Sequence, residues 1–266
     1  MKTARMVAGA FLAIVLAAAL WPRGIDPAKF DRQFRNLPDA PISRQFPLGT
    51  DDLGRDRLSR LLYGTRISLV AAPAAALVSA FLAALFGGLA GFFGGWTDRI
   101  FTAATDLMLS LPWLFLLIIV RALLPLNVSA GVSIVVTFGL IAVLGWPPAA
   151  RVVRAGCIAL RDSDLVLQAR ASGLTRSRIL FRHVVPNVRP ILQAQFWTSI
   201  PIYVLAEANL GLLGLGVADP TPTWGNLLRP LGGAFLPAAG AWAPLALMMT
   251  VVSCMYLMRA QEETTR

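Results

Sequence analysis

The sequence predicts an all-α, polytopic membrane protein with about six transmembrane helices. Of its 266 residues, 56% are hydrophobic and only 14% are charged, whereas soluble domains usually carry about 25% charged residues. Mean hydropathy is +0.66. A soluble fold of this length could not bury so much apolar surface. The domain count is therefore a count of spans, each of which needs about 20 apolar residues.

Six predominantly apolar segments approach or exceed this length. They cover residues 6–21, 67–96, 100–124, 129–150, 191–216 and 232–258. Prolines inside them, such as Pro73 and Pro112, are tolerated where neighbouring helices satisfy the backbone. Small residues, such as Gly87 and Gly91, allow helices to approach closely. Six spans place both termini on one side of the membrane.

The first segment has two interpretations. It follows Lys2 and Arg5 and ends near alanines 17–19, which also fits a secretory signal peptide. We expect an uncleaved anchor, because the rest of the chain is membrane-embedded. The predicted organisation is an anchor helix with an external segment over 1–66, a transmembrane domain over 67–258 and a short tail over 259–266.

The positive charge indicates topology. The formal net charge is +10, and loop 151–190 holds eight arginines against Asp162 and Asp164. Short loops rich in Arg and Lys stay in the cytoplasm, so we expect this loop there and segment 23–66 outside. Because the arginines are divided between two sides of the bilayer, a nucleic-acid partner is disfavoured.

Several chemistries are disfavoured for this chain alone. Lys2 and Lys29 are the only lysines and neither follows a glycine, so there is no phosphate-binding P-loop. His183, Cys157 and Cys254 have neither zinc-ligand nor redox spacing. Nucleophile motifs such as Gly-x-Ser-x-Gly are also absent. We therefore predict no catalytic residue, no metal site and no bound cofactor.

Residues 161–187 predict a helix, a turn and a second helix. Ser163 or Asp164 can cap the first helix, and Gly173 can end it in the left-handed conformation. Thr175 can cap the second helix, and Pro186 can stop it because proline has no amide hydrogen. The expected inner contacts are Leu165, Ala169, Ile179, Leu180 and Val184. The arginines expected to stay in water are Arg170, Arg176, Arg178 and Arg182.

This hairpin resembles the "EAA" coupling loop of ABC importer permeases. Gly173 and Pro186 fit that pattern, with support from His183 and Asn187. Leu167 stands where the family has glutamate, Gln168 where it has its first alanine, and Ala169 matches the second. The alternative is a re-entry loop that is basic only for topological reasons.

Two other stretches resemble the peptide/nickel branch of these permeases. They are 47–69, which precedes the second span, and 213–226, which follows the fifth. Three separated motifs thus occur in order between about 47 and 226. Beyond 232 the resemblance fades to hydrophobicity, and the tail lacks the Gly-Asp-rich ending common in this branch.

The resemblance implies the type I ABC importer permease fold in the bacterial cytoplasmic (inner) membrane. It implies four kinds of partner: a second permease subunit, two ATP-binding subunits, an external substrate-binding protein and the lipid membrane. ATP and Mg²⁺ would be bound in the ATPase subunits. The implied cargo is a di- or oligopeptide, glutathione or nickel. The implied ATPase-coupling residues are Leu167, Gln168, Ala169, Arg170, Gly173, Arg182, His183 and Pro186.

Outside the membrane, Asp51 or Asp52 can cap a short helix that Gly64 ends. This region and the stretch around Trp224 are either a docking surface for the binding protein or a structural re-entry helix. The candidate contacts are Asp51, Asp52, Arg55, Trp224 and Asn226.

Asp106 and Glu207 lie within predicted spans, where charges are costly and often functional. Each can line the translocation pathway. Each can instead pair with an arginine such as Arg121 or satisfy interior polar groups.

Three rival functions stay open at this point. They are a carrier that works without ATP, a diverged permease paralogue with weak ATPase coupling, and an integral-membrane enzyme. The last is disfavoured by the missing nucleophile, metal and paired-carboxylate motifs.

Overall fold

The computed structural model describes residues 30–125 and 128–229, with isolated positions 6, 7, 9–13, 15, 17, 249, 250 and 253. Apart from those positions, the predicted first and sixth spans and the tail 259–266 lie outside the described residues. Every regular element of the described part is helical, beside one isolated bridge between Thr50 and Asp56. The all-α prediction is confirmed.

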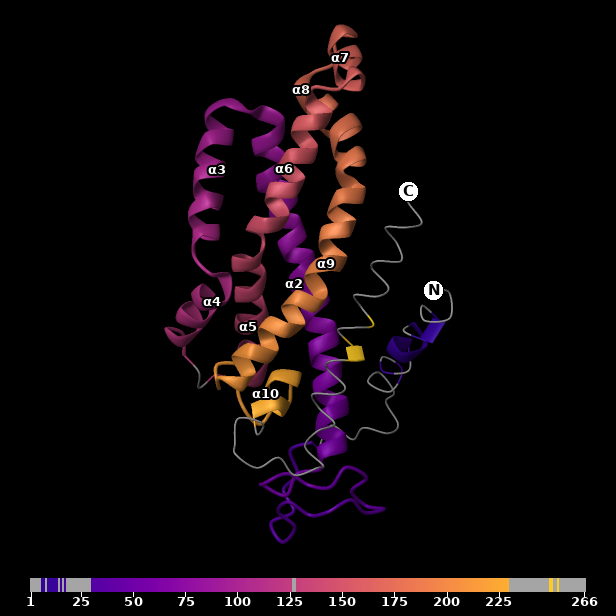
Figure 1. Ribbon diagram of the computed structural model, residues 1–266, viewed down its shortest axis with the longest axis vertical. Helices are drawn as coiled ribbons and strands as arrows, with labels where there is room; N and C mark the ends of the chain where they lie inside the picture. Colours follow the sequence, from indigo (N-terminus) through magenta and orange to yellow (C-terminus); the bar gives the residue numbers. More distant parts are fainter. Residues whose placement is uncertain are drawn as a thin grey trace. The chain divides into compact units, whose positions relative to one another are not determined.

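Ten helical segments follow one another in the described part of the chain (Figure 1). They are α2 Arg57–Phe93, α3 Gly95–Ser110, α4 Trp113–Ala122, α5 Ala130–Gly145, α6 Pro147–Arg161, α7 Asp164–Ala171, α8 Arg176–Ile179, η1 Leu180–Val184, α9 Val185–Leu212 and α10 Trp224–Leu228.

The chain divides into two compact units. Unit 1 contains Met1–Pro73, Arg121–Gly139 and Pro201–Arg266, and unit 2 contains Ala74–Val120 and Leu140–Ile200. Helices α2, α4, α5 and α9 contribute residues to both units.

Helix α2 corrects the prediction of a separate external helix. A single helix of 37 residues runs from Arg57 to Phe93, so Gly64 ends nothing. Its first turn is capped by Asp56, whose carboxylate accepts from the amides of Leu58 at 3.2 Å and Ser59 at 3.3 Å. Asp51 instead accepts from the Leu53 and Arg55 amides of the preceding turn.

The predicted third span, 100–124, is broken. Helices α3 and α4 are bent by 82° at this point. Pro112 explains the break, because a proline forces its predecessor out of the helical region. Leu111 is accordingly extended, with φ −90° and ψ 136°.

The predicted fourth span, 129–150, also differs from the structure. It is a pair of helices, α5 and α6, bent by 40°. Two prolines, Pro147 and Pro148, occupy the first turn of α6, where their missing amide hydrogens cost nothing. Helix α6 then continues to Arg161, beyond the predicted boundary.

Pro186 does not stop the second helix of the hairpin. Segments α8, η1 and α9 follow one another without interruption from Arg176 to Leu212. The five-residue π-helical turn η1 widens the backbone, and the Val185 amide accordingly donates to the Leu180 carbonyl, five residues back. Pro186 is then the second residue of α9, where it removes one amide donor without ending the helix.

Among the described residues, α2 alone is long and apolar enough to cross a membrane. Each of the two bent pairs also qualifies if it is counted as one span, which gives up to three. Helix α9, the counterpart of the predicted fifth span, is not among them. Its sequence includes Arg189 and Glu207, which lower its apolarity.

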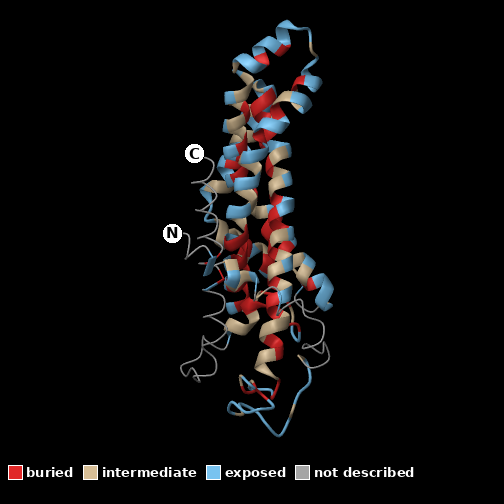
Figure 2. Ribbon diagram, turned by 90° about the vertical axis from the view of Figure 1, so that its right-hand side faces the viewer, coloured by how far each residue is buried: buried red, intermediate tan, exposed pale blue. Residues whose placement is uncertain are grey.

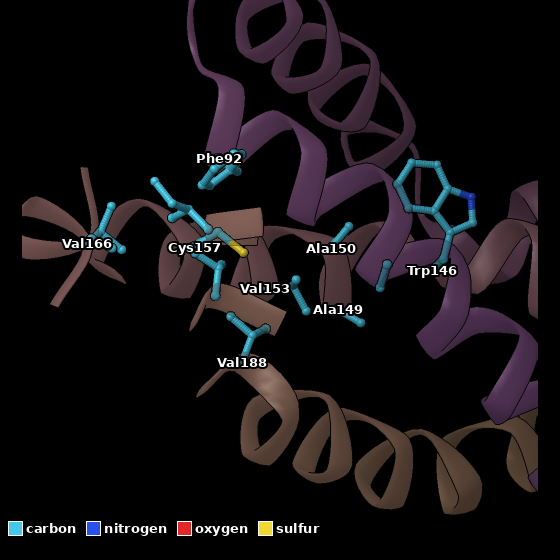
Figure 3. Close-up of a cluster of buried hydrophobic side chains, with 12 residues drawn as sticks. Phe92, Trp146, Ala149, Ala150, Val153, Cys157, Val166 and Val188 are labelled. Carbon is cyan, nitrogen blue, oxygen red and sulfur yellow. The ribbon is translucent and has the colours of Figure 1, made fainter. Parts of the chain in front are cut away.

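Unit 2 has one buried hydrophobic cluster, drawn in Figure 3. It comprises Ala83, Phe92, Trp146, Ala149, Ala150, Val153, Cys157, Val166, Ala169, Ile179, Val184 and Val188. Close packing of α2 on α6 depends on glycine: a Cβ added at Gly87 would lie 2.3 Å from the Ala150 carbonyl oxygen. The small residues in this predicted span do bring two helices together.

Candidate functional site

The hairpin formed by α7 and α8 projects at one end of unit 2, where α6 ends and the α8–η1–α9 helix begins (Figure 1). Gly173 has φ +77°, as predicted for the turn. The Leu174 amide donates to the Ala169 carbonyl at 3.2 Å, and the Gly173 amide donates to the Arg170 carbonyl at 2.9 Å. These two bonds form a Schellman motif, which fixes the direction of the chain after α7.

The inner side of the hairpin is anchored in the buried cluster of unit 2. Val166, Ala169 and Ile179 are at most 5% exposed. Leu165, a predicted inner contact, is 44% exposed, and Val166 takes its place. Val166 and Ala169 are three positions apart on α7 and share the face that packs into the buried cluster.

The outer side is exposed over most of its surface (Figure 2). Of the predicted coupling residues, Leu167, Gln168, Arg170, Gly173, Arg182 and Pro186 are exposed, His183 is half-buried and Ala169 is buried. The predicted wet arginines Arg176 and Arg178 are exposed as well. The hairpin thus combines a buried apolar anchor with a cationic outer surface.

The N-cap residues lie at the predicted positions, but their side chains do not cap the helices. Ser163 and Thr175 are the N-cap residues of α7 and α8, and neither side chain accepts a capping hydrogen bond. The Ser163 hydroxyl donates instead to the Leu160 carbonyl at 2.6 Å. Asp164 is the first residue of α7.

Two ion pairs join α3 to α6 in unit 2. Asp106 pairs with an arginine, one of the two alternatives that the sequence left open, and the partner is Arg151 instead of Arg121. The role of Asp106 as a pathway residue stays a prediction. One turn further along α6, Arg154 Nη2 donates to Asp98 Oδ2 at 2.7 Å. Arg121 belongs to unit 1, where its buried guanidinium donates to the Gly216 carbonyl at 3.2 Å.

In unit 1, four of the five predicted docking residues are held by internal contacts. Arg55 is 8% exposed and lies 2.7 Å from Asp51. Trp224 is 1% exposed, and its indole N–H donates to Thr65 Oγ1 at 2.8 Å. Asn226 Nδ2 donates to the Val217 carbonyl at 2.7 Å. These contacts enclose the Trp224 ring within unit 1, and its role in docking stays a prediction.

Asp52 is the one exposed member of the five predicted docking residues. Among the described residues of unit 1, none forms a hydrogen bond or an ion pair with the Asp52 carboxylate. A contact between Asp52 and an external protein stays a prediction.

Glu207 is fully buried in unit 1. Its Oε2 accepts from the Gly225 amide at 3.2 Å and from the Ser68 hydroxyl at 3.4 Å. The same hydroxyl accepts from the Trp224 amide at 3.2 Å. Glu207 therefore joins α9, α2 and α10, the arrangement expected if it satisfies interior polar groups. Its role as a pathway residue stays a prediction.

Three polar residues of α2 that contact this region were not predicted from the sequence: Arg60, Thr65 and Ser68. Thr65 and Ser68 are three residues apart on α2, so both face the α10 turn. Arg60 donates to the Pro220 carbonyl at 3.2 Å. A signal for this face of α2 does exist in the sequence: two hydroxyl side chains, Thr65 and Ser68, lie one helical turn apart just before an apolar run.

The described residues between 30 and 229 contain no candidate metal centre. No three His, Cys, Asp or Glu side chains there are grouped to hold an ion.

Comparison with known proteins gives one family. Residues 83–261 match the family described as "Binding-protein-dependent transport system inner membrane component". The chain is 32% identical over 252 residues to the "Glutathione transport system permease protein GsiD" of Pectobacterium atrosepticum, covering 93% of this chain and 81% of the relative.

Two further relatives name peptides. The "Oligopeptide transport system permease protein OppC" of Bacillus subtilis is 34% identical over 202 residues, which is 75% of this chain and 64% of the relative. The "Di/tripeptide transport system permease protein DppC" of Pseudomonas aeruginosa is 34% identical over 224 residues, which is 82% and 72%. This chain therefore belongs to the binding-protein-dependent inner-membrane components, the permease subunits of ABC importers.

Proposed function

We propose that this chain forms half of the translocation pathway of an ATP-driven importer for short peptides, glutathione included. The three relatives above carry oligopeptide, di/tripeptide or glutathione in their names, and glutathione is itself a tripeptide. None of those three names nickel, so nickel is the second candidate cargo and rests on the motif resemblance alone.

The proposed assembly has a second permease subunit, two ATP-binding subunits and an external substrate-binding protein. ATP and Mg²⁺ would be held by the ATP-binding subunits, and hydrolysis would occur there. This division agrees with the absence of a glycine-lysine phosphate loop in the present chain.

The observation that carries the coupling role is the anchoring of the hairpin. Its inner residues Val166 and Ile179 are buried, and its turn is fixed by the Schellman motif at Gly173. A stiff projection can transmit a rigid-body movement, whereas a loose loop would absorb it. The outer surface, including the exposed Leu167 and Gln168, would lie against one ATP-binding subunit.

Gly173→Pro tests this role in the reconstituted complex. Proline holds φ near −65°, whereas Gly173 has φ +77°. Proline also lacks the amide hydrogen that bonds Arg170. We expect membrane insertion to persist and binding-protein-stimulated ATPase activity and peptide uptake to fall at least tenfold.

Gly173→Asn is the matched control, because asparagine tolerates the left-handed conformation. It should keep most of both activities. Full activity of the proline variant would contradict the coupling role. Uptake that proceeds without any ATP-binding subunit would favour a carrier instead. Competition between peptides and nickel in the same assay identifies the cargo.

A further inference from the structure

Two cavities of unit 2 are lined by residues of α2, of α6 and of the continuous α8–η1–α9 helix. The first has a volume of about 300 Å³ and is lined almost entirely by apolar side chains of α2, α6 and the η1–α9 helix. The second has a volume of about 220 Å³ and is lined by the ends of α2 and α6 and by the hairpin. Both sizes suit parts of a small molecule better than isolated waters.

The two cavities succeed one another along each segment. On α2 the apolar cavity uses positions 81–89, and the second cavity uses Phe92 and Phe93 at the end of the helix. On α6 the order is Val153 and Cys157, then Arg161. Along α2, the helix that is long and apolar enough to span a membrane, the apolar cavity thus precedes the second cavity, which lies at the end of the helix.

The second cavity is cationic. Arg161, Arg170 and Arg176 line it together with two phenylalanines. Arg161 is paired with Asp162 at 3.0 Å, and the hydrogen bonds from Arg161 lower the pKa of the Asp162 carboxyl. Among the described residues, Arg170 and Arg176 have no carboxylate within ion-pair distance. Two positive charges are left for an anionic occupant.

We propose that these cavities bind one anionic phospholipid of the cytoplasmic leaflet. Its phosphate would lie between Arg170 and Arg176, since guanidinium groups match phosphate oxygens. One acyl chain would lie in the apolar cavity, beside Gly88. Basic pockets between membrane helices on the cytoplasmic side are typical sites for anionic head groups.

Charge and shape together favour a lipid over an acidic side chain of a protein partner. A carboxylate from a partner would neutralise the arginines and leave the apolar cavity empty. The lipid satisfies both cavities with one molecule. Gly88 is consistent with this, because a Cβ added there would meet nothing within 4 Å.

Native mass spectrometry of the full-length chain, titrated with phosphatidylglycerol or phosphatidylcholine of identical acyl chains, tests the proposal. We expect phosphatidylglycerol to bind preferentially. Arg170→Ala/Arg176→Ala should weaken its binding about thirty-fold, since each cation near the membrane surface contributes about fivefold. The double variant Arg178→Ala/Arg189→Ala, which removes two exposed arginines outside the cavity, should leave binding within about twofold.

Gly88→Phe tests the apolar half, because the ring would fill the cavity. We expect weaker phosphatidylglycerol binding with both arginines intact. Inorganic phosphate that competes at equal concentration would show an anion site without lipid selectivity and overturn the proposal. Equal losses in the two arginine variants would also overturn it, since they would reflect net charge alone. Lipid binding is measured without transport, so this result is independent of the proposed function.

Discussion

A few single residues decide how closely the segments of unit 1 approach one another. A Cβ added at Gly211 of α9 would lie 2.2 Å from the Gly225 carbonyl carbon of α10. Gly225 in turn brings its amide to Glu207. The close approach of these two backbones therefore needs glycine on both sides, and it delivers a hydrogen-bond donor to a buried carboxylate.

Glu207 tests whether that carboxylate is structural. Glu207→Gln keeps an oxygen that can accept from the Gly225 amide, so we expect stability and uptake close to those of the unchanged chain. Glu207→Leu leaves that buried amide and the Ser68 hydroxyl without an acceptor, which costs about 1–3 kcal/mol. Thermal unfolding in detergent measures the difference. Loss of uptake in the glutamine variant at unchanged stability would instead assign the negative charge to the pathway.

At the scale of helices, proline acts according to its position. Pro112 breaks the predicted third span, because Leu111 must be extended. Pro147 starts α6, and Pro186 lies just inside α9 after the π-turn η1. A proline can thus end a helix, begin one or lie inside one, depending on where in the helix its missing amide hydrogen falls.

The pairing of α3 with α6 is testable by double-mutant cycles. Asp98 and Arg154 have side chains 22% and 28% exposed, whereas Asp106 and Arg151 are each 52% exposed. We expect a coupling energy of about 1 kcal/mol for Asp98→Asn with Arg154→Gln. The Asp106→Asn and Arg151→Gln cycle should give less than about 0.5 kcal/mol, because the more exposed side chains of that pair lose more conformational freedom when they are held in one geometry. Equal coupling in both cycles would contradict the role of burial.

At the scale of the whole molecule, Leu167 in place of the family's glutamate bears on how strongly ATP hydrolysis is coupled to transport. Leu167 is 51% exposed on the outer side of the hairpin. Leu167→Glu would place a carboxylate three positions before Arg170, where the two can pair within α7. We therefore expect binding-protein-stimulated ATPase activity to change less than about threefold.

Gln168→Glu, at the next exposed position, is the control for added negative charge. A gain of tenfold or more in the Leu167→Glu complex alone would identify this chain as a weakly coupled permease paralogue. The ATPase assay of the reconstituted complex distinguishes these outcomes.

Much of the hairpin could be predicted from the sequence, because its signals are local. Gly173, Ser163 and Thr175 occupy the predicted turn and cap positions, since dihedral preferences act over a few residues. The predicted inner face of α7 was wrong at Leu165, which is exposed, whereas its neighbour Val166 is buried. One position along a helix rotates a side chain by about 100°, so a small error in the predicted direction of the face exchanges the two. The prediction of a separate external helix was wrong at Gly64. This glycine does not end a helix but lets α2 pack closely, because a Cβ added there would lie 3.3 Å from the Thr223 backbone.

By itself the sequence determined that this is a helical membrane protein with a basic helical hairpin, and the motifs pointed to a permease. Hydropathy and local backbone preferences are additive along the chain, so they survive without knowledge of the fold. Only the tertiary structure decided which polar groups are occupied. Glu207, Trp224 and Arg121 form hydrogen bonds with groups far away in the sequence, whereas Arg170 and Arg176 line the cationic cavity. Such pairings join residues far apart in sequence, and no local pattern specifies them.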